Sequence, residues 1–255
     1  MRAISLQSGS NGNCIYVESG DVRLLFDAGI SGKQAELRMA ECGRDIRDVQ
    51  AVLISHDHSD HSKSLGIFQR KFGLPVCVTP RTLLQAGTRA SLGKLNQIEH
   101  FEAGSSLQFG HVTVETVPTP HDGADGVAFV VDDGQRRLGI LTDLGHIFRG
   151  LPELLESLDA LLLESNYDLQ MLSSGWYPAH LKRRIRGPGG HLSNEEAARL
   201  VAASTNGRLQ WLCLAHLSHE NNTPERALAA HHRVLGNRLP IHVASRFSVS
   251  EAMDV

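Results

Sequence analysis

Residues 51 to 61 read Ala-Val-Leu-Ile-Ser-His-Asp-His-Ser-Asp-His, which is an apolar run followed by three histidines and two aspartates. The apolar run 51–55 predicts a buried strand that delivers a His-x-His-x-Asp-His motif onto a loop just before a helix. Because alternate residues of an extended segment face the same way, His56 and His58 can bind one metal ion. Asp60 and His61 then turn toward a second. The alternative is a polar loop whose histidines are satisfied within the protein.

Three more candidate ligands follow other predicted strands. His121 comes after the run 112–120, Asp143 after 138–142 and His216 after 211–215. Taken alone, a histidine at a strand end is more often structural. Beside the first motif, however, side chains at neighbouring strand ends can converge on one rim of a folded domain although they are remote in sequence. Imidazole and carboxylate ligands suit zinc, manganese or iron, so we expect two divalent metal ions.

The order of the remaining elements predicts an α/β protein with a single domain over residues 1–255. Short β-rich runs recur at 3–6, 14–18, 23–26, 51–55, 75–79, 112–117, 127–131, 138–142, 160–163, 211–215 and 241–244. Helical periodicity covers 33–41, 62–72, 82–93, 194–204 and 224–235, and Ser193 with Glu196 predicts a capping box. Strands dominate the first half and alternate with helices in the second, which indicates two packed sheets with helices outside.

The composition of the chain limits its possible partners and location but does not identify its activity. A net charge of −3 means that any contact with nucleic acid must come from a local patch. No apolar run is long enough to cross a bilayer, and the first residues lack a secretory signal, so we expect a cytoplasmic protein without membrane contact. The four cysteines form no C-x-x-C pair, and we expect reduced, mostly buried thiols.

The series Asp27, His56-x-His58-x-Asp60-His61, His121, Asp143, His216 resembles the five-motif pattern of the metallo-β-lactamase superfamily. The resemblance implies a four-layer αββα sandwich and assigns the ligands. One metal would be held by His56, His58 and His121. The other would be held by Asp60, His61 and His216, with Asp143 bridging both ions and Asp60 also taking part in catalysis. Asp27 would orient the first loop, although it could be a simple turn residue.

Differences between this sequence and other branches of the superfamily reduce the number of possible activities. Flavo-diiron proteins have Glu where this chain has His58, which disfavours redox chemistry. Antibiotic-hydrolysing members commonly have Cys or His in place of Asp143. Thioesterases of the glyoxalase type share the ligands and remain competitors.

Five stretches, residues 8–14, 162–167, 177–185, 190–195 and 216–222, look closely like the YycJ/WalJ-type bacterial hydrolases. That resemblance implies a cytoplasmic metal-dependent nuclease, notably an exonuclease acting on DNA 5′ ends. A cyclic or small-molecule phosphodiesterase ranks second, a thioesterase third and an inactive nucleic-acid-binding module fourth.

Several residues are candidates for work beyond metal binding. His191 is the candidate proton donor to the leaving group, with Glu164 holding its ring, as in similar tRNA-processing enzymes. The alternative is that His191 merely precedes a helix cap and Glu164 merely ends a strand. His216, at its strand end, is expected to be the ligand rather than His219.

Contacts with a DNA substrate are expected from two further groups of residues. Stacking faces and cations for phosphates come from Trp176, Tyr177, Lys182, Arg183, Arg184 and Arg186. Backbone N–H groups for a phosphate come from the turn that contains Ser8, Ser10, Asn11 and Asn13. The alternatives are a solvated charge run on an ordinary loop and an ordinary Gly/Ser turn.

Overall fold

The computed structural model describes residues 1–204 and 206–255, whose strands form two seven-stranded sheets. The first sheet has the order β14 (Met253–Asp254), β1 (Arg2–Gln7), β2 (Cys14–Ser19), β3 (Val22–Phe26), β4 (Ala51–Leu53), β5 (Val76–Val78) and β6 (Ile98–His100). The second has the order β13 (Ile241–Val243), β12 (Trp211–Ala215), β11 (Ala160–Glu164), β10 (Arg137–Leu141), β9 (Val127–Asp132), β8 (Val112–Pro118) and β7 (Ser106–Phe109).

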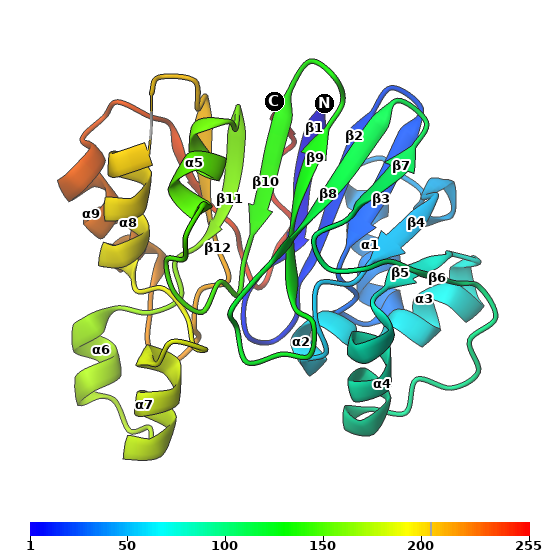
Figure 1. Cartoon of the computed structure of the whole chain (residues 1–255), viewed down its shortest axis with the longest axis horizontal. Helices are drawn as coiled ribbons and strands as arrows, with labels where there is room; N and C mark the ends of the chain where they lie inside the picture. Colours follow the sequence, from blue (N-terminus) through cyan, green and yellow to red (C-terminus); the bar gives the residue numbers. More distant parts are fainter. Residues whose placement is uncertain (205) are drawn as a thin grey trace.

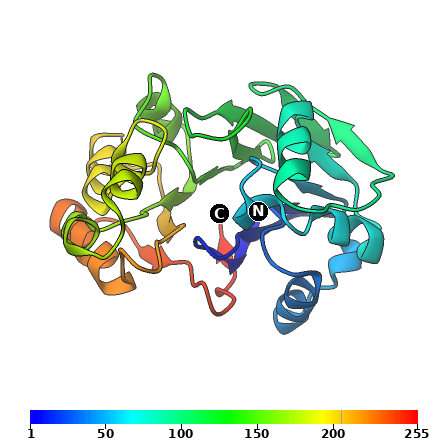
Figure 2. The same cartoon turned by 90° about the horizontal axis from the view of Figure 1, so that it is seen from below.

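Helices cover the outer face of each sheet (Figure 1). The first sheet packs against α1 (Gly32–Glu41), α3 (Leu65–Phe72) and α4 (Pro80–Arg89) through one apolar cluster. The second packs against α5 (Leu151–Glu156), α8 (Asn194–Ser204) and α9 (Pro224–Leu235) through another. Seen from below, the blue and cyan helices lie on the opposite side of the molecule from the yellow and orange ones (Figure 2).

The inner faces of the two sheets share a third apolar cluster. Phe26 of β3 meets Phe129 of β9 across this layer, with ring centroids 5.1 Å apart. Apolar side chains alternate between the inner and outer clusters along a strand: Leu24 faces the other sheet, whereas Leu25 faces the helices. The predicted αββα sandwich is therefore confirmed.

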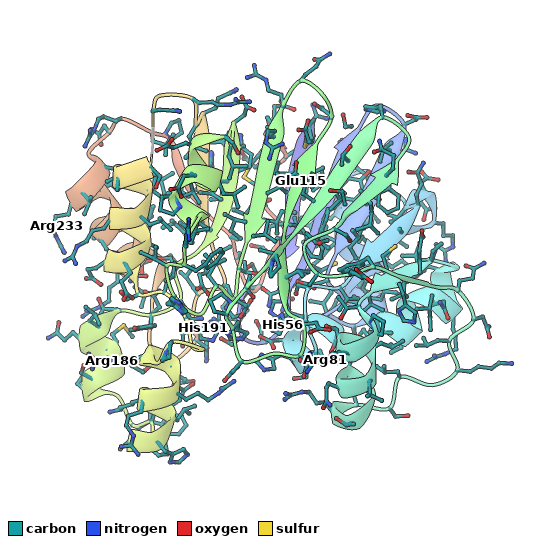
Figure 3. The ribbon with its side chains drawn as sticks, in the orientation of Figure 1. His56, Arg81, Glu115, Arg186, His191 and Arg233 are labelled. Atoms are coloured by element: carbon teal, nitrogen blue, oxygen red, sulfur yellow. The ribbon has the colours of Figure 1, made fainter. Side chains whose placement is uncertain are left out.

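Each sheet changes from antiparallel to parallel pairing along its width. β3, β4, β5 and β6 run parallel in the first sheet, and β10, β11, β12 and β13 run parallel in the second. Parallel strands end at the same edge of a sheet, and loops at that edge are the usual place for a site in α/β folds. His56 and His191 both lie at this lower edge, whereas Glu115 lies toward the opposite one (Figure 3).

Two of the predicted helices differ in their bounds. The segment 62–72 is divided into α2 (Ser59–Ser62) and α3, because Ser64 leaves helical geometry with φ −110° and ψ 5°. The helix predicted over 82–93 begins at Pro80, since the Thr79 side chain caps it by accepting the Thr82 N–H at 3.1 Å, and it ends at Arg89. The capping box at the start of α8 is confirmed: Glu196 N donates to Ser193 Oγ at 3.2 Å, and Ser193 N donates to Glu196 Oε2 at 2.9 Å.

The sequence did not predict several short elements. These are β6, β7, β14, α5, α6 (Leu169–Ser174), α7 (Ala179–Arg186) and the 3₁₀ turn at Ile46–Asp48. All four cysteines are free thiols, as expected, and only Cys42 is not fully buried. Within residues 1–204 and 206–255, no helix has the length and apolar character needed to span a membrane.

Candidate metal centre

The edge where the parallel strands end carries most of the predicted ligands. Asp27 follows β3, Asp143 follows β10 and His216 follows β12. These three residues have φ values of 65°, 57° and 54°, in the left-handed region that side chains other than glycine seldom adopt. Such a conformation costs on the order of 1–3 kcal/mol and persists only where the surroundings fix it, so it clusters at functional sites.

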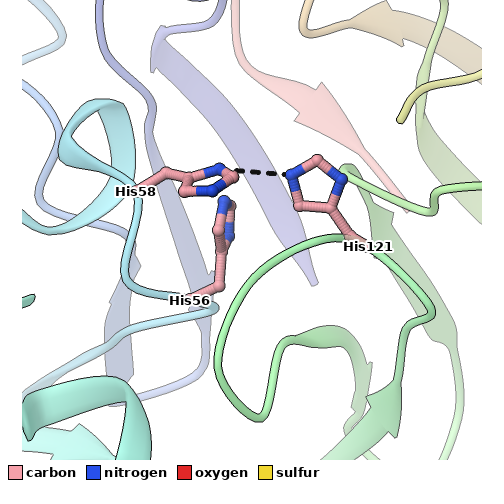
Figure 4. A group of neighbouring side chains, drawn as sticks. All are labelled: His56, His58 and His121. Carbon is pink, nitrogen blue, oxygen red and sulfur yellow. Dashed lines mark hydrogen bonds between the residues drawn. The ribbon is translucent and has the colours of Figure 1, made fainter. Parts of the chain in front are cut away.

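Three histidines form the first group of candidate ligands (Figure 4). Nδ1 of His58 lies 3.2 Å from Nε2 of His121, and the ring of His56 lies 4.6 Å from that of His58. Nδ1 of His121 donates to the Gly190 carbonyl at 2.8 Å, which leaves its Nε2 as the lone-pair atom. Nε2 of His56 is buried and has no hydrogen-bond partner among the described residues. This orientation of lone pairs toward one point suits a cation.

The second group consists of Asp60, His61 and His216. Nε2 of His216 lies 3.3 Å from Oδ2 of Asp60 and 3.4 Å from Nε2 of His61. On its other side, His61 donates from Nδ1 to Oδ2 of Asp27 at 2.7 Å. A carboxylate at that position fixes both the tautomer and the ring orientation of a histidine ligand.

Asp27 holds a second group as well. Its Oδ1 accepts the backbone N–H of Ser55 at 2.8 Å, directly before the His-x-His-x-Asp-His loop. Asp27 is therefore both a residue of a tight turn and the anchor of that loop, and the two interpretations of its role are compatible.

Asp143 lies between the two groups. Its Oδ2 is 3.2 Å from Nε2 of His61, and its Oδ1 is 3.6 Å from Nε2 of His121 and 3.7 Å from Nε2 of His216. Oδ2 is also a buried atom without a hydrogen-bond partner within the described part of the chain. A buried carboxylate oxygen left without a donor is costly, and a cation would satisfy it. The residues present thus fit divalent metal ions.

The titration of the histidines supports the same conclusion. Burial lowers the pKa of His58 to about 4 and places that of His56 well below its usual value, so both rings are neutral, as ligands must be. Burial opposes a charge on His61 too, but the carboxylates of Asp27, Asp143 and Asp60 outweigh it and raise its pKa well above the usual value. This side of the site has a surplus of negative charge that a divalent cation would balance.

Glu164, the last residue of β11, is fully buried beside this cluster. Its Oε1 accepts the backbone N–H groups of Leu144 at 3.2 Å and Leu192 at 2.9 Å. Its Oε2 accepts the N–H of Asp143 at 3.1 Å and lies 3.2 Å from Nδ1 of His191. Glu164 therefore joins the loops that carry Asp143 and His191, which is more than the sequence suggested.

His191 lines the cavity in front of the candidate ligands. Burial alone would lower its pKa, but the hydrogen bond and charge of Glu164, together with Asp143 and Asp60, raise it above the usual value. His191, Glu164, Asp143 and His216 also lie close enough to form a ligand set of their own. Since the oxygens of Glu164 are occupied by backbone N–H groups, we favour the first two groups as the metal ligands.

The comparisons with known proteins place the chain in a family. A family model described as "Beta-lactamase superfamily domain" matches residues 22–216. The exodeoxyribonuclease YycJ of Bacillus anthracis is 34% identical over 98% of this chain and 92% of its own length. The exodeoxyribonuclease WalJ of Streptococcus pneumoniae (strain D39) is 36% identical over 92% of this chain and 86% of its own length.

This chain belongs to the beta-lactamase superfamily. The prediction that it is of the YycJ/WalJ type is confirmed as well. Among solved structures, the metallo-beta-lactamase fold protein YhfI of Bacillus subtilis superposes with a TM-score of 0.72 over 98% of each chain. With 18% identity, that likeness concerns the fold alone.

A cavity of about 430 Å³ opens in front of the candidate metal ligands. Of the Gly/Ser turn, Ser10 lines this cavity and Asn11 is exposed. Ser8 and Asn13 are instead buried. Ser8 Oγ accepts the N–H of His216 at 2.8 Å, and Nδ2 of Asn13 lies 3.0 Å from Nε2 of His61. Their backbone N–H groups, which were expected to bind a phosphate, already donate to the carbonyls of Ser245 at 3.0 Å and Asp60 at 2.7 Å, so Ser8 and Asn13 hold the ligand loops instead.

The basic run lies on α7 and not on a loop. The side chains of Tyr177 and Arg184 line the cavity, and Arg184 pairs with Asp122 at 2.6 Å. Lys182 Nζ donates to the carbonyls of Ser173, at the end of α6, and of Gly175, directly after it, while Arg183 and Arg186 are exposed. The cluster therefore divides into one cavity cation, one structural cation and two surface cations.

His219 lies where the sequence predicted it, whereas Arg89 was not predicted. His219 is exposed, with Nδ1 2.9 Å from Oε1 of Glu220, so only His216 joins the cluster. The sequence did not point to Arg89, which lines the cavity and donates from Nε to the buried carboxylate of Asp57. Asp57 stands between His56 and His58 in the sequence. Because its carboxylate is buried, it needs a cationic partner, but the sequence did not show which residue this would be.

Proposed function

We propose that this chain is a two-metal-dependent exonuclease that hydrolyses the phosphodiester bonds of DNA from the 5′ end. The observation that carries the proposal is the similarity to two proteins named exodeoxyribonuclease, which extends over nearly the whole chain. It is supported by the convergence of His56, His58 and His121 on one side of Asp143 with Asp60, His61 and His216 on the other.

Metals held there would lower the pKa of a bound water and stabilise charge on the phosphate, and zinc, manganese or iron all suit the ligands. The protein has separate tasks. His191 faces the cavity and can donate a proton to the leaving alkoxide, while Glu164 holds its ring. Tyr177 and Arg184 line the same cavity and would contact the DNA strand there. We place the enzyme in the cytoplasm, where its thiols stay reduced.

The decisive experiment offers the metal-loaded enzyme four substrates: end-labelled DNA, RNA of the same sequence, a cyclic dinucleotide and a thioester. Metal content is measured on the same sample. We expect about two ions per chain and the release of nucleotides from the 5′ end of DNA. Faster hydrolysis of the thioester or of the cyclic dinucleotide would select one of the competing functions. A fully loaded enzyme that cleaves none of the phosphodiesters would contradict the proposal.

A further inference from the structure

We propose that a second cavity, beside the metal centre, binds the unpaired part of a nucleic-acid strand whose end is being hydrolysed. This cavity, called here the aromatic groove, has a volume of about 330 Å³ and is lined by Asn11, Tyr177, His219, Glu220, Arg246 and Phe247. The assignment of this groove to nucleic acid rests on the proposed function, and it adds the path that the DNA strand takes beyond the metal centre.

The aromatic groove adjoins the cavity of the metal centre. Ser10 and Tyr177 line both cavities, so the two share this part of their boundary. The segment after β12 crosses from one to the other: His216 belongs to the metal cluster, Ser218 lines its cavity and His219 lines the aromatic groove. A DNA strand that leaves the metal centre on this side would pass Ser10 and Tyr177 and reach the groove next.

The groove also borders on the two most exposed large apolar side chains among the described residues. Trp176 is 75% exposed and Phe247 is 74% exposed, whereas the other five exposed side chains of this kind are aliphatic. Trp176 packs edge-on against Tyr177 at 4.8 Å, and its Nε1 donates to Oε2 of Glu220 at 3.1 Å. Aromatic faces turned to water beside a catalytic cavity are not explained by packing.

The backbone of Phe247 is held by two hydrogen bonds, whereas its ring is exposed to solvent. The carbonyl accepts from Nη2 of Arg38 at 2.9 Å, and the N–H donates to Oγ of Ser245 at 3.0 Å. The guanidinium carbon of Arg246 lies 5.9 Å from the centre of the ring. The backbone from which the ring projects is therefore ordered before a ligand arrives, which limits the loss of entropy on binding.

The charges of the groove suit bases on its floor and phosphates at its rim. Arg246 is anchored on the Leu217 carbonyl and brings a guanidinium to the wall. The one carboxylate of the lining, Glu220, is already paired with His219 and Trp176, so its repulsion of a phosphate is reduced.

Stacking on protein aromatics requires bases whose faces are not already covered by neighbours in a duplex. Each stacked base contributes about 1–3 kcal/mol, whatever its identity. The groove therefore selects for single-stranded over duplex ends and not for a particular sequence.

The first test measures how KM depends on the length of single-stranded DNA, from two to ten nucleotides, with the metal-loaded enzyme. For the wild type we expect KM to fall as each added nucleotide reaches the groove. Phe247→Ala should flatten this dependence and raise KM for the longest substrate about fivefold to a hundredfold, while Phe247→Tyr restores it. The control is Leu84→Ala, which removes a similarly exposed side chain from α4 (67% exposed) and should leave the curve unchanged. Parallel curves for wild type and Phe247→Ala would overturn the proposal.

The second test separates the groove from the hydrolytic function. In a Trp211→Phe background Trp176 is the single tryptophan, and its fluorescence reports stacking directly. Single-stranded phosphorothioate DNA should quench it at a lower concentration than a blunt duplex does. Quenching without hydrolysis of ordinary DNA would support the groove and refute the exonuclease. Equal quenching by the two forms, or a dimer that Phe247→Ala disperses in sedimentation, would refute the groove.

Discussion

Replacement of Glu164 by Gln tests how far one buried carboxylate holds the site together. The two side chains have the same shape, so no cavity is created. Glu164 receives four donors, however: the N–H groups of Asp143, Leu144 and Leu192, and Nδ1 of His191. Gln has one oxygen and one NH₂ group. If the NH₂ replaces Oε1, two backbone donors face it; if it replaces Oε2, at least the N–H of Asp143 does, because Nδ1 of His191 can accept in its other tautomer.

The magnitude follows from that count. A buried donor left without an acceptor costs about 1–3 kcal/mol, so one or two of them lower the free energy of unfolding by about 1–6 kcal/mol. Domains of this kind are stable by roughly 5–15 kcal/mol, so the decrease should be large on that scale. Loss of activity should accompany it, because the loops carrying Asp143 and His191 are both released.

Urea unfolding of wild type and Glu164→Gln, both with a chelator present, measures the difference without a contribution from metal. Glu153→Gln is the matched control, since Glu153 is exposed on α5 and its replacement should change stability by less than about 0.5 kcal/mol. If Glu164→Gln unfolds within about 1 kcal/mol of the wild type, the four donors do not depend on this carboxylate and the reasoning is wrong.

Three further outcomes are expected. His216→Ala should lower the number of metal ions bound per chain, measured by mass spectrometry, whereas His219→Ala should not; the reverse result would exchange their roles. Replacing Arg183 and Arg186 by Ala should weaken DNA binding and reduce its salt dependence by about 0.7–0.9 for each phosphate that is no longer neutralised, with Arg233→Ala on α9 (Figure 3) as the control. An unchanged slope would make both arginines bystanders. His231 is buried in α9 with its pKa lowered to about 4. Because the unfolded chain takes up that proton first, near pH ~6.5, the free energy of unfolding should fall by up to about 3 kcal/mol as the pH drops from there to about 4. His231→Leu should remove this part of the pH dependence and His232→Leu, its exposed neighbour, should not; identical curves for all three proteins would contradict it.

The sequence predicted the parts of the molecule that are encoded locally. The strand β4 and the motif after it are contiguous, so their alternation and spacing could be interpreted directly. His121, Asp143 and His216 were predictable for a related reason: each directly follows an apolar run, and parallel strands bring such ends to one edge.

Other features depend on contacts that no local pattern reveals. The Gly/Ser turn looked like a phosphate-binding turn, yet Ser8 and Asn13 are buried by packing against loops that are distant in sequence. Helix α7 buries only Ile185 and consists mostly of basic residues, so its sequence looked like a charge run and not like a helix. Asp57 and Arg89, the last residue of α4, are separated in the chain by two helices and a strand, and sequence spacing gave no sign of their pairing.

The left-handed backbone at Asp27, Asp143 and His216 has a consequence for engineering and for evolution. Glycine would relieve the strained φ at each position, but at Asp27 and His216 it would also remove buried hydrogen bonds. At Asp143 it would instead remove a buried carboxylate whose Oδ2 has no hydrogen-bond partner among the described residues. A variant library screened only for heat resistance should therefore enrich replacements of Asp143 while losing the ability to bind metal. Selection for durability and selection for turnover act in opposite directions on this one edge of the sandwich.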